Sequence, residues 1–189
     1  STLAYRDASH DRPYMSSTYS MSCIFYNCKA ITDISDLKLD FVELASSCYY
    51  QMFYGCTSLT TAPELPATTL AGSCYCSMFM GCTSLTTTPK LPATELAESC
   101  YYSMFRGCTS LTTAPELPAT TLAGSCYQYM FYGCSNLNSI TVYASPWNTS
   151  YASAWVVEVS PTGTFTCPSS LSIQTGTSGI PVGWTRVDL

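Results

Sequence analysis

The sequence has few charged residues and no long hydrophobic run. Only 10% of its 189 residues are charged, and seven lysines and arginines stand against twelve aspartates and glutamates, for a net charge of −5. There is no basic stripe to neutralise a phosphate backbone, so we expect no nucleic-acid partner. No apolar run approaches the roughly 20 residues that span a bilayer, and no basic-then-apolar signal segment begins at Ser1. We therefore expect no transmembrane segment.

Residue patterns typical of catalytic and metal sites are also scarce. The single histidine, His10, precedes the repeated part of the chain, and no C-x-x-C motif occurs to suggest zinc. Glu64, Lys90 and Glu116 occupy equivalent repeat positions, which predicts a ladder of alternating surface charge rather than a pocket that raises a carboxyl pKa. Each exposed pair in that ladder would contribute roughly 0.2–1 kcal/mol. We expect no enzyme, cofactor or metal, because no nucleophile, base and orienting group occur together.

The chain instead contains a 26-residue segment that is repeated almost unchanged. Three full copies and a partial fourth begin at Cys48, Cys74, Cys100 and Cys126. A fixed period of this length is typical of a solenoid, in which each unit buries its apolar face against its neighbours. A degenerate copy occurs at 23–28, with Asn27 at the left-handed position that glycine takes in the other copies.

Within one copy, the pattern predicts a short helix, a short strand and a corner. Apolar residues between Leu44 and Phe53 follow the spacing of one helical face, and Thr68 is placed to cap the next helix. The β-branched stretch 58–62 predicts a strand, which Pro63 ends because proline cannot donate to a ladder. The expected fold is an α/β solenoid of short parallel strands and short helices.

The last part of the chain departs from the repeat. Segments 138–143, 156–159, 164–166 and 184–187 are rich in β-formers and are separated by proline and glycine turns. We therefore divide the chain into an N-terminal cap or truncated upstream region at 1–22, repeats at 23–137 and a β-rich C-terminal cap at 138–189. Such a cap would cover the exposed end of the stack.

Twelve cysteines occur, and most lie in phase with the repeat. One column contains Cys48 and its three equivalents, and a second contains Cys56 and its three equivalents. Thiols pack well as small hydrophobic groups, so columns of buried free cysteines are the simpler interpretation. Disulfides remain the alternative, because an oxidising compartment favours them.

Candidate binding residues come from the few positions at which the copies differ. These positions are 50, 51 and 54 of the first copy and their equivalents in the others, among them Cys76, Ser77 and Ser103. They bracket the predicted helix and are expected to face outward as a band along one side. Tyrosine and arginine, which are enriched in binding hot spots, are frequent there. The candidates are Tyr50, Tyr54, Tyr102, Arg106, Tyr129 and Tyr132. The alternative is that these residues are simply unconstrained surface.

The segment Met52-Phe53-Tyr54-Gly55-Cys56-Thr57-Ser58-Leu59 and its copies resemble the A-F-x-x-C-x-x-L core of BspA-like leucine-rich repeats. The ending, from Gly163 to Thr185, is similar to the terminal segment of the same proteins. The resemblance implies a right-handed leucine-rich-repeat solenoid with no catalytic residues. It also implies a bacterial protein that is secreted or anchored at the cell surface through a segment not present here.

The function implied by the resemblance is adhesion through protein binding. The expected partners are surface or extracellular proteins of a host or neighbouring cell, with glycans as a second class. Two alternatives remain: a structural spacer or stalk within a larger surface protein, and a glycan-binding module.

Overall fold

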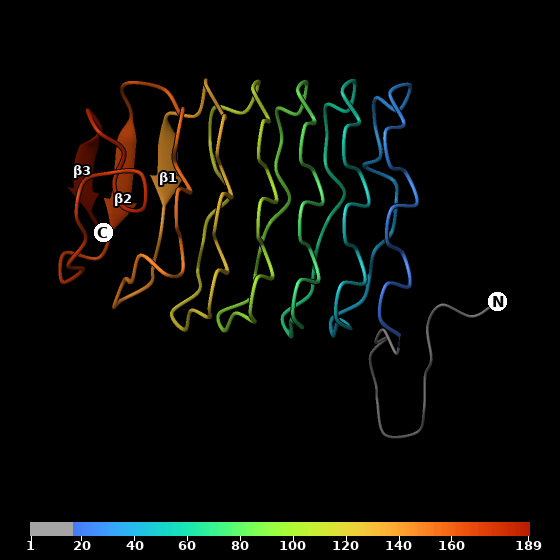
Figure 1. Ribbon diagram of the computed structural model, residues 1–189, viewed down its shortest axis with the longest axis horizontal. Coiled ribbons are helices and arrows are strands. Elements are labelled where there is room, and N and C mark those ends of the chain that lie inside the picture. The colour runs from blue at the N-terminus through green and yellow to red at the C-terminus, as the bar shows by residue number, and fades with distance from the viewer. Residues whose placement is uncertain (1–16) are drawn as a thin grey trace.

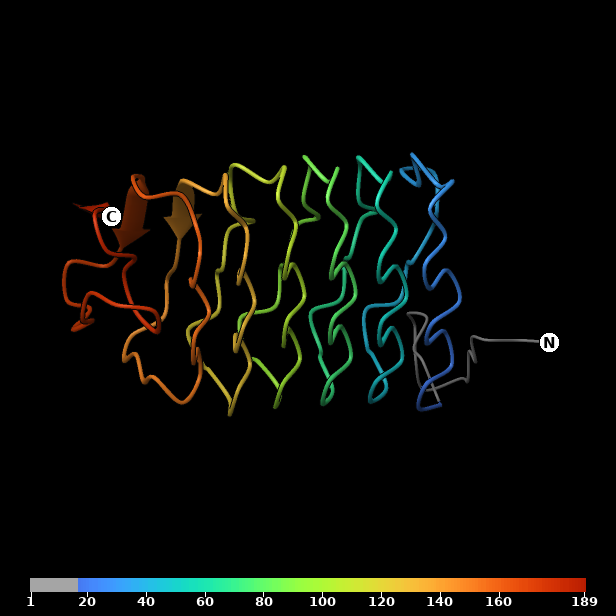
Figure 2. The same cartoon turned by 45° about the horizontal axis from the view of Figure 1, so that its top comes forward.

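The computed structural model describes residues 17–189, which form a stack of coils around one continuous core. Figures 1 and 2 show the coils side by side along the long axis, with the N-terminal coil at one end and the C-terminal strands at the other. The architecture is a repeat solenoid with parallel strand pairing, as the repeated sequence predicts. The predicted segment 1–22 lies mostly outside the described residues, and His10 lies entirely outside them.

The main element of each coil is a chain of tight turns, which we call the turn ribbon: 47–56, 73–82, 99–108 and 125–134. Along the first ribbon, alternate N–H groups donate to the carbonyl three residues back, as Met52 does to Tyr49 at 3.2 Å. The intervening N–H groups donate to the next coil, as Phe53 does to Met78 at 2.9 Å. Half of the ribbon's backbone hydrogen bonds therefore join neighbouring coils.

The predicted helices are wrong, since residues 17–189 contain none. Every fourth ribbon residue has a left-handed backbone, with φ of 53° at Ser47, 52° at Gln51 and 70° at Gly55. This geometry interrupts any right-handed helix, and the role of helix cap predicted for Thr68 does not arise. The apolar residues recur as adjacent pairs every four positions, a spacing close enough to the helical one to imitate it.

The core consists of rows of identical side chains, one from each coil. Ring centroids are 5.5 Å apart between Phe53 and Phe79 and 5.6 Å apart between Tyr49 and Tyr75, with nearly parallel planes. These separations are those of offset-stacked aromatic pairs. Leucines and methionines form further rows, all fully buried: Leu59, Leu85, Leu111, Met52, Met78 and Met104. Each coil thus covers the apolar face of its neighbour.

The predicted five-residue strands within the repeats shrink to single parallel bridges. Thr61 bridges Asp33 on one side and Thr87 on the other, and Thr113 bridges Ser139. The proline that follows each of these segments removes a donor and ends the pairing. Backbone pairing between repeats therefore depends more on the turn ribbons than on strands.

The C-terminal part contains one parallel sheet in the order β1-β2-β3. Its strands are β1 Ser139–Thr141, β2 Thr164–Cys167 and β3 Thr185–Asp188. Strands were predicted at 164–166 and 184–187, and β2 and β3 confirm them. β1 is shorter than the predicted 138–143. β3 has all four residues exposed, and Arg186 hydrogen-bonds the carbonyls of Pro168, Ser169 and Leu171 beside it.

The strand predicted at 156–159 is wrong, because 150–158 continues the ribbon pattern. The N–H groups of Tyr127 and Phe131 donate to Tyr151 and Trp155 of this segment at 2.8 and 2.9 Å. Its left-handed residues are Ala154 and Glu158. Trp155 takes the core position that methionine holds in the earlier coils, so the repeated packing extends beyond the repeated sequence.

Within residues 17–189, no helix of the length and apolarity needed to cross a membrane is found.

Candidate functional site

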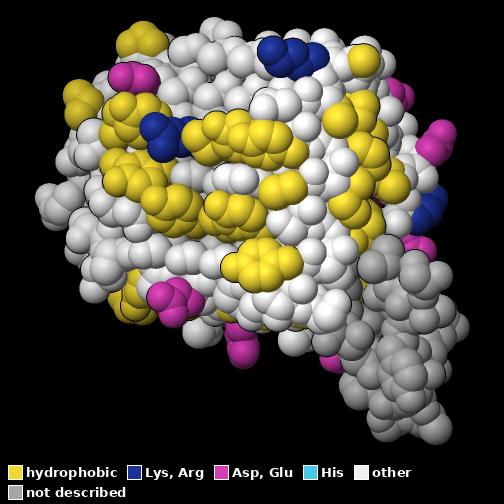
Figure 3. Space-filling view, turned by 45° about the vertical axis from the view of Figure 1, so that its right-hand side comes forward, with side chains coloured by type: hydrophobic (Ala, Val, Ile, Leu, Met, Phe, Trp, Pro, Cys, Tyr) yellow, Lys and Arg dark blue, Asp and Glu magenta, His cyan; other side chains and the backbone are white. Residues whose placement is uncertain are grey.

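The candidate site lies on the outer side of the turn ribbons. The ribbon directs adjacent pairs such as Met52 and Phe53 into the core and leaves the two residues between successive pairs nearer the surface. All six predicted binding residues occupy these outer positions and are half-buried: Tyr50, Tyr54, Tyr102, Arg106, Tyr129 and Tyr132. Figure 3 shows hydrophobic side chains, a class that includes tyrosine, gathered in rows over one face of the molecule.

The six residues form two groups. In the first, Tyr54 stacks on Tyr26 of the preceding coil, with centroids 4.8 Å apart and planes 7° from parallel. Tyr50 meets Tyr19 edge to face at 6.3 Å. Partial burial raises the pKa of Tyr50 above its ordinary value.

The second group surrounds Arg106. Its guanidinium carbon lies 4.7 Å from the ring centre of Tyr132 and 5.7 Å from that of Tyr129. Tyr129 in turn meets Tyr102 edge to face at 5.6 Å. Cation–π attraction holds a guanidinium over such rings. The result is a cation whose position is fixed by two aromatic side chains of the next coil.

The two groups are not joined into one continuous band. Three of the positions expected to face outward, Cys76, Ser77 and Ser103, are buried. The Cys76 thiol lies 3.7 Å from the Ser77 hydroxyl, and desolvation raises its pKa. The tyrosine-rich surface is therefore divided by the coil that contains Cys76.

The cysteines are free thiols, all twelve of them. In the Cys56 row, each thiol donates to the carbonyl of a phenylalanine in the preceding coil, with Sγ–O distances of 3.0 to 3.2 Å. In the Cys48 row, burial raises the pKa of Cys48 to about 12 and that of Cys126 to about 11. A thiol that stays protonated is a poor nucleophile and a poor metal ligand. Residues 17–189 also contain no group of three side chains placed to hold a metal ion.

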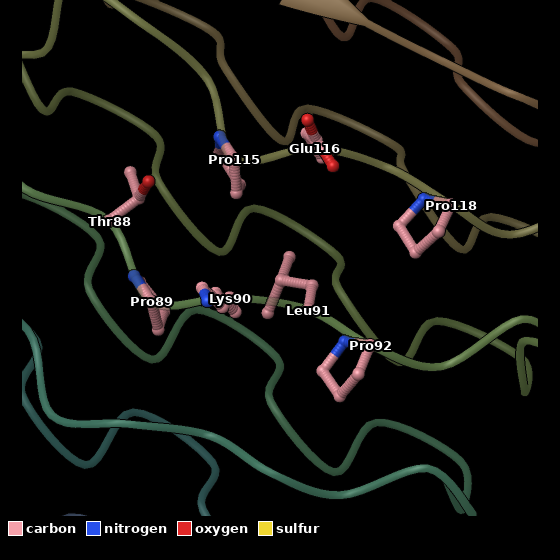
Figure 4. A pocket seen from close by; sticks show the side chains of 8 residues that line it. All are labelled: Thr88, Pro89, Lys90, Leu91, Pro92, Pro115, Glu116 and Pro118. Atoms are coloured by element: carbon pink, nitrogen blue, oxygen red, sulfur yellow. The ribbon is translucent and has the colours of Figure 1, made fainter.

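A second surface was not anticipated as a site. Two hollows of about 510 and 530 Å³ lie between successive proline corners, and they share Thr88, Pro89, Lys90 and Pro92. Figure 4 shows segments 89–92 and 115–118 of adjacent coils side by side around one hollow. The paired prolines of each copy, such as Pro63 and Pro66, are the signal for this surface in the sequence; they predict the end of the strand and a corner, but no hollow.

The charge ladder beside these hollows differs from the prediction. Glu64, Lys90 and Glu116 are exposed and alternate in sign along the coils. Within residues 17–189, none of the three is in an ion pair within 4 Å. The expected pairwise stabilisation is absent, and the charges are left to solvent.

The stacked coils, the parallel pairing and the buried row of leucines define a repeat protein of the leucine-rich class. The chain matches the model of the BspA-type leucine-rich repeat region in six copies, over residues 14–104 and 49–176. These segments cover most of the 189 residues, so the chain belongs to this family, which confirms the resemblance seen in the sequence. Comparison with curated proteins and with solved structures gave no match.

Proposed function

We propose that this chain is a non-catalytic protein-interaction module of the adhesion type, secreted or displayed at a bacterial cell surface. The family is consistent with a surface repeat module. The proposed partners are extracellular proteins of a host or neighbouring cell. The proposed binding surface comprises Tyr54 with its stacked neighbour and the group around Arg106.

One observation carries the proposal: the repeat keeps its core identical while large tyrosines and one arginine occupy the outer ribbon positions. Tyr54 and Tyr132 are half-buried, so part of each ring already rests on the protein and part remains free for a partner. A ring held in this way loses little side-chain freedom on binding. Tyrosine and arginine are also the residue types that most often dominate binding energy.

The same features argue against catalysis. Raised thiol pKa values leave the buried cysteines protonated, and the exposed carboxylates Glu64 and Glu116 lie beside open solvent. Neither arrangement supplies an activated nucleophile or a carboxyl group tuned to act as an acid near neutral pH. The acidic balance of the chain argues against nucleic acid as a partner.

The test is a binding comparison on a panel of purified extracellular matrix and cell-surface proteins, measured by surface plasmon resonance. A triple variant carries Tyr54→Ala, Arg106→Ala and Tyr132→Ala. A matched control carries Glu64→Ala, Lys90→Ala and Glu116→Ala on the proline corner. We expect the ribbon variant to lose at least about tenfold in affinity for any protein that the wild type binds, because hot-spot truncations have this size.

The control variant should retain wild-type affinity, and circular dichroism should show both variants folded. If the ribbon variant binds as tightly as the wild type, the proposed surface is wrong. If no panel protein binds, the rigid stacked core favours the alternative of a spacer or stalk. A glycan array reports on the remaining alternative, since tyrosine rings can stack on sugars.

A further inference from the structure

The surroundings of Arg106 indicate which chemical group the partner presents, an inference that rests on the proposed interaction function. We propose that Arg106 is the anchor for a carboxylate of an acidic protein segment. Tyr129 and Tyr132 hold its guanidinium in place, and the aspartate or glutamate side chain of the partner is the ligand.

The first argument is that Arg106 has hydrogen-bonding capacity to spare. Its guanidinium has no ion-pair partner and no hydrogen bond within residues 17–189, and its side-chain contacts are with tyrosine rings. Arg186 shows the contrast, because its side chain donates to three carbonyls and to Asp188. A guanidinium offers five N–H donors in a planar fork that matches a carboxylate.

The second argument is the isolation of this charge. Arg106 is the only charged residue in the four turn ribbons, which span 47–56, 73–82, 99–108 and 125–134, and it is still the only cation when the ribbon-like segment 150–158, which carries Glu158, is included. The rest of the protein carries an acidic excess. An acidic segment therefore meets one favourable point on this face, and that point sets the position of the segment.

The arrangement favours the carboxylate of a protein side chain over a phosphate group and over the carboxylate of an acidic sugar. Recognition of phosphate groups in peptides relies on clusters of arginines, whereas this face has one. The hydroxyls of an acidic sugar need several polar side chains to orient them. The ribbon at 125–134, which supplies the tyrosines beside Arg106, contains one amide side chain, Gln128. A single planar cation beside two tyrosine rings suits a planar anion with one charge, such as the carboxylate at the end of an aspartate or glutamate side chain.

The experiment uses two labelled peptides and the full chain in physiological salt. One peptide alternates glutamate with phenylalanine, and its twin has glutamine in place of every glutamate. Fluorescence anisotropy gives the affinity of each for the wild type, Arg106→Gln, Arg106→Lys and the control Lys90→Gln. We expect Arg106→Gln to weaken binding of the glutamate peptide about tenfold, the size of a charged hydrogen bond.

Binding of the glutamine twin should not change in Arg106→Gln, and Lys90→Gln should match the wild type for both peptides. The affinity of Arg106→Lys for the glutamate peptide should lie between those of the wild type and Arg106→Gln, because lysine keeps the positive charge but lacks the planar fork of N–H donors. Equal affinity of the wild type for both peptides, or an Arg106→Gln variant that binds as well as the wild type, overturns the proposal. So does tighter, Arg106-dependent binding of sialyllactose or a phosphotyrosine peptide.

These outcomes are separable from the fate of the proposed function. If the peptide result fails while the triple ribbon variant still loses an extracellular protein partner, only the carboxylate assignment is wrong. If both fail, the ribbon face is not the binding surface.

Discussion

The thiol of Cys108 donates a hydrogen bond to the carbonyl oxygen of Phe79, with the sulfur 3.2 Å from the oxygen. The same carbonyl accepts the N–H of Cys82 at 3.1 Å within its own coil. Cys108 thus ties two coils together while filling a fully buried position. A small apolar side chain with a weak donor satisfies both demands, which explains why cysteine recurs at this place in the repeat.

Replacing Cys108 with alanine should lower the free energy of unfolding by about 1–2 kcal/mol. The substitution removes a buried sulfur atom and one hydrogen bond between coils. Urea denaturation followed by tyrosine fluorescence measures the loss. Cys23 is exposed, so Cys23→Ala is the matched control and should change stability by less than about 0.5 kcal/mol. Equal losses in the two variants would contradict the role assigned to the thiol.

The repeat, the core rows and the parallel stacking could be predicted from sequence because they depend only on which residues recur. The ribbon could not, because pairs such as Met52 and Phe53 recur every four residues, close to the period of a helix. The distinction lies in the left-handed backbone at Ser47 and Gln51, residues for which sequence gives no such preference. Only at Gly55 and its equivalents does the residue type predict a left-handed backbone.

The candidate site was predictable to a similar extent. Differences among the copies identified Tyr54, Arg106 and Tyr132 as outer positions, where the structure indeed places them. The same reasoning wrongly placed Cys76 and Ser103 outside. Their equivalents Tyr50 and Gln51 are half-buried, so the short side chain rather than the position explains why these two residues are buried. The contact of Arg106 with two tyrosines could not be predicted from the sequence, since it joins side chains of adjacent coils.

Stability should fall at alkaline pH because of the buried thiols. Burial raises the pKa of Cys126 to about 11 and that of Cys48 and Cys134 to about 12, from an ordinary value of 9.0. The unfolded chain therefore releases these protons first as pH rises. The stabilisation that these protonated thiols contribute is complete below about pH 9. It is lost as pH rises through the pKa values of the thiols in the folded chain, at about 1.4 kcal/mol per pH unit for each thiol.

Denaturant titrations at intervals from pH 7 to pH 11 would measure this loss. A Cys48→Ala variant is the control. Its free energy of unfolding should decline less steeply with pH than that of the wild type, because it lacks the contribution of one buried thiol. A free energy of unfolding that stays constant between pH 9 and pH 11 would show that the thiols ionise as readily in the folded chain as in the unfolded one.

The row of glycines at the end of each ribbon should tolerate asparagine better than alanine. Gly107 has φ of +74°, and a Cβ there would be 3.8 Å from the Cα of Gly81, so the backbone conformation rather than space limits substitution. Asn27 holds this position in the first coil with φ of 56°. Gly107→Ala should cost about 1–2 kcal/mol, and Gly107→Asn clearly less, as measured by thermal unfolding.

Gly55 gives a matched comparison, because the Asn27 amide oxygen occupies the space that a Cβ of residue 55 would need. Gly55→Ala should therefore destabilise more than Gly107→Ala, and adding Asn27→Gly should restore part of the difference. Equal costs for the two alanine variants would mean that the asparagine side chain moves aside freely.

The contact between Arg106 and Tyr132 should appear as a coupling energy in a double-mutant cycle. Arg106→Gln and Tyr132→Leu are made singly and together, and urea denaturation gives the free energy of unfolding of each. With the guanidinium carbon 4.7 Å from the ring centre, we expect a coupling of about 0.5–1 kcal/mol, the size of a partly exposed cation–π pair. The control cycle pairs Arg106→Gln with Tyr54→Leu, two coils away, and should give no coupling. A zero value in both cycles would mean that Tyr132 does not hold the guanidinium, and the fixed cation on which the carboxylate proposal rests would be lost with it.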